Sequence, residues 1–161
     1  MNKQRIAAGT LTVTVALAVA LAGDIARAQV NGTESDAEIE TLKRRVDQFF
    51  GNLTDSAIGP EYAVRDLVGK GPLKDRNDDI NKLIEQASGL PQRYGEYTGH
   101  EAVGQKAAGK DLVFLRYLYK GEKFPVVWYF TFYRTGPSGS LTRTWQLIGM
   151  RFDTKVDGLE K

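Results

Sequence analysis

The position of the aromatic residues is the feature that most constrains the fold of this chain. The chain has 16 aromatic residues, and 13 of them lie at or beyond Tyr94. Aromatic and β-branched side chains are typical of strands, whereas the part before Tyr94 has apolar residues at three- and four-residue steps, which is typical of helices. This order predicts an α+β domain in which N-terminal helices pack on one face of a curved antiparallel sheet.

Three helices are predicted before the sheet, each with a signal at one of its ends. Ser35 and Glu38 form a capping box at the start of the first, Pro60 suits the first turn of the second, and Gly89 followed by Pro91 stops the third. The second and third helices begin near residues 60 and 75. Their predicted buried positions are Ile39, Leu42, Val46, Phe49 and Leu53; Tyr62, Val64, Leu67 and Val68; and Ile80, Leu83, Ile84 and Ala87.

Strand-like segments fill the rest of the chain. The first, 94–106, is weakly patterned and is either one strand or a bent pair. The other predicted strands are 112–119, 126–134 and 142–152, with loops at 120–124 and 134–141. The segment 126–132 is apolar on both faces, which indicates a sheet that is covered twice or strongly curved, with a concavity between sheet and helices.

The N-terminal segment has the organisation of a secretory signal peptide. Basic residues precede an uncharged run over 6–23, and Ala26-Arg27-Ala28 is an A-x-A cleavage motif. An uncleaved membrane anchor is the alternative, because the run approaches the ~20 residues that span a bilayer. We expect cleavage after Ala28 and an exported protein, periplasmic or extracellular, without a stable membrane anchor. The expected organisation is a signal peptide at 1–28, a flexible N-terminus at 29–34, a single domain at 35–155 and a charged tail at 156–161.

Charge and composition limit the partners of this chain. The formal net charge of +2 falls to zero once residues 1–28 are removed, so a basic face for nucleic acid is not expected. The chain has no Cys, which excludes disulfides, Cys-ligated metals and thiol catalysis. A single His removes multi-His metal sites, and we expect no metal site and no cofactor.

The order of elements and the character of the strands resemble the nuclear-transport-factor-2-like superfamily, which includes ketosteroid isomerase. The likeness is carried by Phe49-Phe50 at the end of the first helix, by Pro125–Tyr133 and by Thr144–Phe152, and it extends over about residues 35–155. The resemblance implies a cone-shaped α+β fold. The superfamily includes isomerases, dehydratases, ligand carriers and non-enzymatic interaction domains, so the resemblance alone does not choose a function.

Enzymes of this superfamily transfer protons with a carboxylate and a Tyr or His inside the cone. No such motif transfers to this chain, because its sheet carries acidic residues only at strand ends and in the weakest strand. His100 and Glu101 are adjacent, so their side chains point to opposite faces of a strand, and we expect His100 at the surface or in a loop. We therefore name no catalytic residue. A proton-transfer enzyme, isomerase- or dehydratase-like and acting in the cone cavity, is the alternative function.

The sheet supplies the candidate binding residues. Arg116 lies in mid-strand; facing the cavity it would need an anionic partner, and facing solvent it would leave Tyr117 and Tyr119 inside. Trp128, Phe130 and Phe132 share one strand face and form an apolar pocket, a core or a dimer face. The candidate ligand-binding residues are Tyr62, Arg116, Tyr117, Trp128 and Phe130. The expected function is an exported, non-catalytic domain that binds a small apolar or amphipathic ligand or a partner protein, and the sheet is a candidate homodimer face.

Overall fold

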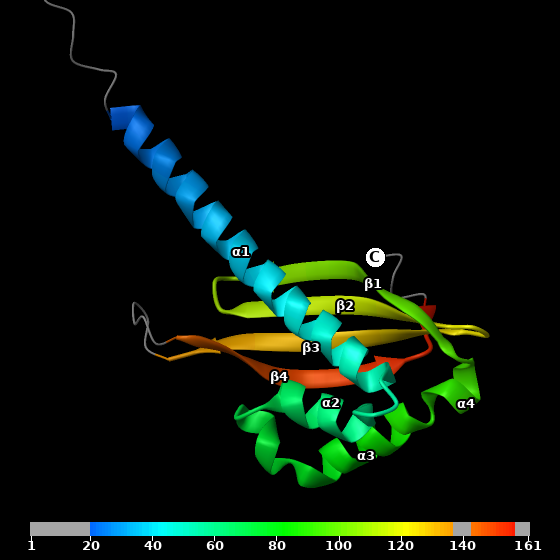
Figure 1. Ribbon diagram of the computed structural model, residues 1–161. Helices are drawn as coiled ribbons and strands as arrows, with labels where there is room; N and C mark the ends of the chain where they lie inside the picture. The colour runs from blue at the N-terminus through cyan, green and yellow to red at the C-terminus, as the bar shows by residue number, and fades with distance from the viewer. Residues whose placement is uncertain (1–19, 137–142, 157–161) are drawn as a thin grey trace, which may run out of the picture. The chain divides into compact units, whose positions relative to one another are not determined.

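Helices come first along the chain and a single antiparallel sheet follows them (Figure 1). The structure is a computed structural model that describes the backbone of residues 20–136 and 143–156 and the side chains of 36–136 and 143–156. Most of the predicted signal peptide, the centre of the 134–141 loop and most of the predicted tail lie outside the described residues. The chain divides into two units, 1–36 and 37–161, and the description below concerns the second unit unless stated.

The helical part has four α-helices and one short 3₁₀ helix. They are α1 (Ala20–Thr54), α2 (Gly59–Val68), η1 (Pro72–Asp75), α3 (Asn77–Ser88) and α4 (Leu90–Tyr94). Pro60 lies in the first turn of α2, as predicted, and Gly69, at φ 56°, ends that helix. α3 ends at Ser88 with Gly89 as its C-cap, as predicted, and Pro91 then takes the first turn of α4, where a missing backbone N–H costs nothing.

The first helix begins earlier than the sequence predicts. α1 starts at Ala20, so the predicted start at Ser35 is wrong, whereas the flexibility of 29–34 stays a prediction. Four alanines lie between residues 20 and 28, and Ala has the highest helix propensity, so helical backbone continues through Ser35 without needing its cap. The predicted cleavage position after Ala28 lies within this helix, and cleavage itself stays a prediction.

The sheet has four strands in the order β1-β2-β3-β4, and every neighbouring pair is antiparallel. They are β1 (Tyr97–Ala108), β2 (Leu112–Gly121), β3 (Pro125–Thr135) and β4 (Thr144–Asp153), so the four predicted strands and the α+β class are confirmed. β1 is one strand with register shifts between Tyr97 and Gly99 and between Ala102 and Gly104. These shifts explain its weak sequence pattern, because each bulge breaks the two-residue alternation of a strand.

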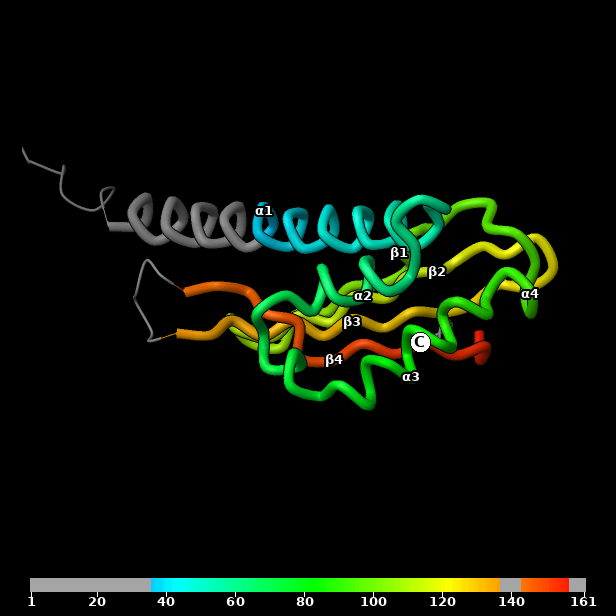
Figure 2. The backbone as a smooth tube through the Cα atoms, turned by 60° about the horizontal axis from the view of Figure 1, so that its bottom comes forward, coloured from blue at the N-terminus to red at the C-terminus, as the bar shows by residue number. Residues whose placement is uncertain are grey.

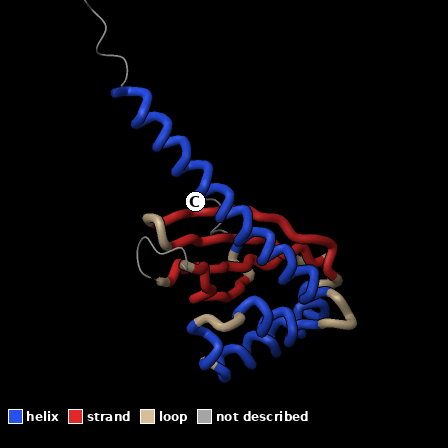
Figure 3. The backbone as a smooth tube through the Cα atoms, turned by 60° about the vertical axis from the view of Figure 1, so that its left-hand side comes forward, coloured by secondary structure: helices blue, strands red, loops and turns tan. Residues whose placement is uncertain are grey.

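The two faces of the sheet have different neighbours. The 37–54 part of α1 crosses one face, and α2 and α3 lie beside β4 (Figure 2). Figure 3 shows the strands side by side as one layer, with the shorter helices gathered at one edge. We call the face toward α1 the inner face and the opposite face the outer face. The inner face buries Val113, Leu115, Tyr117 and Tyr119 of β2 and Val126, Trp128, Phe130 and Phe132 of β3.

Candidate functional site

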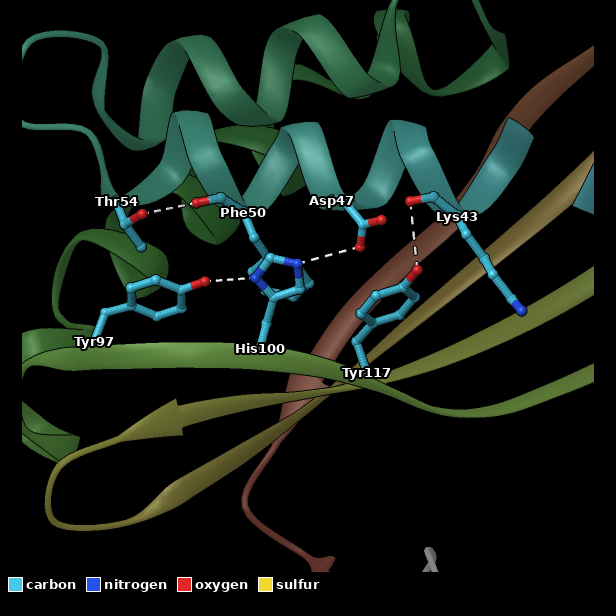
Figure 4. A network of polar contacts seen from close by, with 7 residues as sticks. All are labelled: Lys43, Asp47, Phe50, Thr54, Tyr97, His100 and Tyr117. Carbon is cyan, nitrogen blue, oxygen red and sulfur yellow. Dashed lines mark hydrogen bonds and ion pairs between the residues drawn. The ribbon is translucent and has the colours of Figure 1, made fainter. Parts of the chain in front are cut away.

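A chain of polar contacts joins α1 to the inner face of β1 (Figure 4). The hydroxyl of Tyr97 lies 2.5 Å from Nδ1 of His100, and Nε2 of His100 lies 3.1 Å from a carboxylate oxygen of Asp47. An ionised carboxylate only accepts hydrogen bonds, so Nε2 carries the proton toward Asp47 and Nδ1 accepts the Tyr97 hydroxyl. We call this arrangement the Asp47–His100–Tyr97 network.

A β-bulge creates this network. Residues three apart on a regular strand point to opposite faces, but the register shift between Tyr97 and Gly99 turns Tyr97 and His100 to the same side. The prediction of a surface or loop His100 is therefore wrong, since its side chain is 22% exposed and both ring nitrogens have partners. Gly99, at φ 149°, is the sequence signal that could have predicted this bulge, because a glycine inside a strand often marks one.

Glu101 takes no part in this network. It points to the outer face, where it forms an ion pair of 2.8 Å with Lys120. The hydrogen bond and the positive charge of Lys120 lower the pKa of the Glu101 carboxyl. The expectation that His100 and Glu101 point to opposite faces is confirmed. The carboxylate that contacts His100 is that of Asp47 in α1.

Aromatic rings surround the network, and burial keeps the phenols of Tyr97 and of the neighbouring Tyr117 neutral. The ring of Phe50 stacks on His100 at 4.7 Å between centroids. Burial raises the pKa of Tyr97, and the negative charge of Asp47 raises it further. Burial, and then the charge of Asp47 together with a hydrogen bond to it, also raises the pKa of Tyr117, whose hydroxyl donates weakly to the Lys43 carbonyl oxygen at 3.4 Å. These hydroxyls therefore serve as hydrogen-bond donors rather than as phenolates.

One side of Tyr97 borders a small hollow between the end of α1, the α3–α4 junction and β1. Its volume is about 270 Å³. It is lined by Tyr97, Tyr119 and Glu96 and by residues at the end of α1 and at the α3–α4 junction. A small molecule in this hollow would meet the Tyr97 ring. The network and the hollow together form a polar candidate site on the inner side of the sheet.

The five sequence-predicted binding residues do not form one site. Tyr117, Trp128 and Phe130 lie together, each at most 1% exposed, with ring centroids 5.9–6.0 Å apart for the two pairs that involve Phe130. They fill the space between α1 and the sheet, so they are core. Arg116 lies on the outer face, opposite Tyr129 in the register. Tyr62 is 54% exposed on α2, and Ala63 takes the buried place that the helical pattern assigned to Tyr62.

A larger groove runs between α3 and the edge strand β4, and we call it the α3–β4 groove. Its volume is about 390 Å³. Its apolar lining is Val68, Leu73, Ile80, Leu83, Ile148, Met150 and Phe152. Its polar lining is Arg76, Asp79, Lys82, Gln86 and Arg151, with Gly149 at the bulge of β4. Sequence reasoning missed this groove, because its walls come from two elements about 70 residues apart whose proximity no local pattern records.

The Asp47–His100–Tyr97 network contains too few ligands for a metal ion. Within residues 36–136 and 143–156, no three His, Asp or Glu side chains gather closely enough to hold one. In the part of the chain that the structure describes, no helix is long and apolar enough to cross a bilayer. No protein-family model, curated protein or solved structure matches this chain.

Proposed function

We propose that this chain is an exported, non-catalytic binding domain that takes a small amphipathic anion in the α3–β4 groove. The A-x-A motif at Ala26–Ala28 supports export to the periplasm or the extracellular space. The order of elements, with helices before a β1-β2-β3-β4 sheet, supports the resemblance to the nuclear-transport-factor-2-like superfamily. Because core side chains fill the inner side, the binding site proposed is a surface groove.

The composition of the groove carries this proposal. Seven apolar side chains line it, and its volume of about 390 Å³ falls in the ordinary range for small-molecule sites. Three cations, Arg76, Lys82 and Arg151, stand against one acidic lining residue, Asp79. Arg76 is paired with Asp79 at 2.7 Å, and Arg151 is paired with Asp153 at 2.9 Å, so Lys82 is the lining cation on which the test below relies. An alkyl chain therefore suits the walls, and an anionic head group suits the rim.

The proposal predicts saturable binding of dodecanoate to the wild-type protein in isothermal titration calorimetry. Lys82→Glu reverses an exposed charge at the rim and is expected to weaken binding about tenfold, the effect of losing one charge-assisted contact. Lys70→Glu makes the same change of net charge outside the groove and is expected to leave the affinity unchanged. Leu83→Trp, which adds volume to a lining residue, is expected to weaken binding as well.

Two comparisons decide the outcome of this experiment. Dodecyltrimethylammonium has the same chain and the opposite charge, so the proposal requires that it bind more weakly than dodecanoate. Equal affinities of Lys82→Glu and Lys70→Glu would contradict the proposed groove, and so would the absence of binding by the wild type. The thermal midpoint of Leu83→Trp shows whether that variant remains folded.

The Asp47–His100–Tyr97 network supports a second candidate function, a small proton-transfer enzyme. Asp47 orients the imidazole, and a proton taken up at Nδ1 of His100 would reverse the His100–Tyr97 hydrogen bond. The Tyr97 O–H would then be available to donate toward the adjacent hollow, which Tyr97 lines. A hydroxyl with a raised pKa is a hydrogen-bond donor at neutral pH, which suits a carbonyl oxygen that gains negative charge.

This second function predicts that the protein accelerates isomerisation of 3-cyclohexenone to its conjugated isomer, followed by absorbance. The proton leaves the carbon beside the carbonyl and returns to the far end of the new dienolate, so no co-reactant is needed. His100→Gln is expected to abolish the acceleration, and Lys43→Gln, which keeps the Lys43 backbone carbonyl, is expected to retain it. A wild-type rate equal to that of buffer would argue against this enzyme.

A further inference from the structure

The small hollow beside Tyr97 has an acidic wall, and we call it the α1-end hollow. It lies where the end of α1, the α3–α4 junction and the start of β1 come together, and its volume is about 270 Å³. Asp55 and Glu96 line it, and no Lys, Arg or His of the described residues does. The hollow shares no lining residue with the α3–β4 groove, so the two are separate sites.

The two carboxylates have no cationic partner in the described part of the chain. Within residues 36–136 and 143–156, the Glu96 carboxylate takes part in no ion pair and no hydrogen bond. One oxygen of Asp55 accepts the backbone N–H of Ala57 at 2.8 Å. Arg93, the cation of α4, lies beside Gly89 and does not line the hollow. The described residues therefore leave the negative charge of the hollow without a counter-charge.

Two helices end at this hollow and add to its negative potential. α1 ends at Thr54 and α3 ends at Ser88, and both residues line the hollow. The C-terminal end of a helix carries a partial negative charge, because its last carbonyl groups have no partner within the helix. α4 begins here with its positive end, but it has only five residues, so its dipole is small.

Three hydroxyl groups of the lining residues have already donated their protons. Thr54 and Ser88 each donate to the carbonyl oxygen four residues earlier in their helix, at 2.9 and 2.8 Å, and Figure 4 shows the Thr54 bond. Tyr97 donates to Nδ1 of His100. A hydroxyl has one proton and two lone pairs, so these oxygens can accept a further hydrogen bond but cannot donate one. A ligand of this hollow must therefore supply donors.

Tyr119 brings an unsatisfied hydroxyl to the same hollow. Tyr119 is 1% exposed, it lines the hollow, and its hydroxyl has no hydrogen-bond partner among the described residues. Burial raises the pKa of Tyr119, and the negative charge of Glu96 raises it further, which shows that the phenol faces this carboxylate. A buried polar group without a partner costs free energy, and a ligand that supplies the partner recovers it.

We propose that the α1-end hollow binds a small organic cation of the primary arylalkylammonium class. A primary ammonium group has three N–H donors, which match the Glu96 carboxylate and the hydroxyl oxygens. The rings of Tyr97 and Tyr119, with centroids 5.1 Å apart, attract a cation to their faces, and Leu53 and Leu90 add apolar surface for the ligand body. The volume of the hollow restricts the ligand to a small molecule.

A metal ion is the competing occupant of an acidic hollow. Calcium takes about six to eight oxygen ligands, and this hollow supplies two carboxylates. Within the described ranges, no three His, Asp or Glu side chains gather closely enough to hold a metal ion. The aromatic and aliphatic side chains of the wall suit an organic body better than a hydrated ion, so the hollow favours an ammonium ligand.

The test is titration of 2-phenylethylammonium chloride into the wild-type protein, followed by calorimetry, and saturable binding is expected. Glu96→Gln removes the unpaired carboxylate and is expected to weaken binding about tenfold. Asp78→Asn is the matched control, because it removes an equal charge about 15 Å from Ser88 along α3, farther than the Debye length of about 10 Å at 0.1 M salt. This control is expected to leave the affinity unchanged.

Tyr119→Phe separates a ligand contact from a structural role. Its removed hydroxyl makes no hydrogen bond with the described residues, so the thermal midpoint is not expected to fall. The affinity for 2-phenylethylammonium is expected to fall about fivefold, as for loss of one neutral hydrogen bond. N,N,N-trimethyl-2-phenylethylammonium keeps the charge but has no N–H donor, so it is expected to bind more weakly. Dodecyltrimethylammonium also lacks these donors and is not a ligand of this class.

Four results would overturn this proposal. They are no binding by the wild type, equal affinities of Glu96→Gln and Asp78→Asn, an unchanged affinity of Tyr119→Phe, and displacement of the amine by calcium chloride, which would make a metal ion the occupant. The dodecanoate and 3-cyclohexenone experiments test the other proposals separately. Amine binding needs neither the α3–β4 groove nor a proton transfer, so failure of those experiments is distinguishable from failure of this one.

Discussion

Replacement of Phe50 by Ala is expected to lower the free energy of unfolding by about 3–5 kcal/mol. Phe50 is fully buried at the end of α1. Its ring contacts those of Phe49, His100, Tyr117, Tyr119, Trp128 and Phe130, which come from α1, β1, β2 and β3. Removal of the ring leaves a cavity at the point where the first helix meets the sheet, and the neighbouring aromatic rings are too rigid to fill it.

Urea unfolding monitored by tryptophan fluorescence measures this loss. Tyr62→Ala removes an exposed aromatic ring of similar size and is expected to change stability by no more than about 0.5 kcal/mol. Phe50→Leu retains most of the buried volume and is expected to lose much less than Phe50→Ala. A similar, small loss for Phe50→Ala and Tyr62→Ala would contradict the packing of α1 on the inner face.

Replacement of Gly121 by Ala is expected to destabilise the fold by about 1–3 kcal/mol, as for other substitutions that overfill a packed site. An added Cβ would collide with the carbonyl oxygen of Tyr94 and lie 2.8 Å from that of Phe124. Both atoms are backbone, so neither can move aside as a flexible side chain would. The Tyr94 carbonyl also accepts the amides of Lys123 and Phe124, at 2.9 and 3.1 Å, and the substitution would strain both hydrogen bonds.

Gly51→Ala is the matched control, and its expected effect has the opposite sign. Gly51 lies inside α1, and a Cβ there would meet no atom within 4 Å apart from its chain neighbours and the backbone of its own helix. Alanine in a helix interior is more favourable than glycine by about 0.5–1 kcal/mol, so Gly51→Ala is expected to stabilise the protein. Thermal unfolding of the two variants checks both signs, and destabilisation by both would show that the clash at Gly121 is not the cause.

Patterns of apolar residues predicted the fold well because they record burial directly. The stripe from Ile39 to Leu53 packs on the sheet, and the predicted strands match β1 to β4. Helix caps and helical spacing predicted less well wherever the residues or elements nearby determined where a helix begins or which side chain is buried. The capping box at Ser35 does not begin α1, because helix-forming residues precede it, and Tyr62 has helical spacing but no surface to pack against.

The candidate sites were harder to predict, because register and bulges determine them. A shift of one residue exchanges the two faces of a strand, so the sequence left open whether Arg116 or Tyr117 faces inward. The structure places Tyr117 inside and Arg116 outside. One bulge in β1 turns His100 toward Asp47, a residue 53 positions earlier in the chain, and no pattern around His100 indicates that partner.

Amide chemical shifts show directly whether a ligand binds in the α3–β4 groove or in the interior between α1 and the sheet. We propose that dodecanoate, added to ¹⁵N-labelled protein, shifts the amides of 80–86 in α3 and 148–152 in β4 most strongly. The amides of Tyr117, Trp128 and Phe130 are expected to remain unchanged, because their side chains are packed in the core. The largest shifts at those three core residues, or no shifts along α3 and β4, would contradict a binding site in the α3–β4 groove.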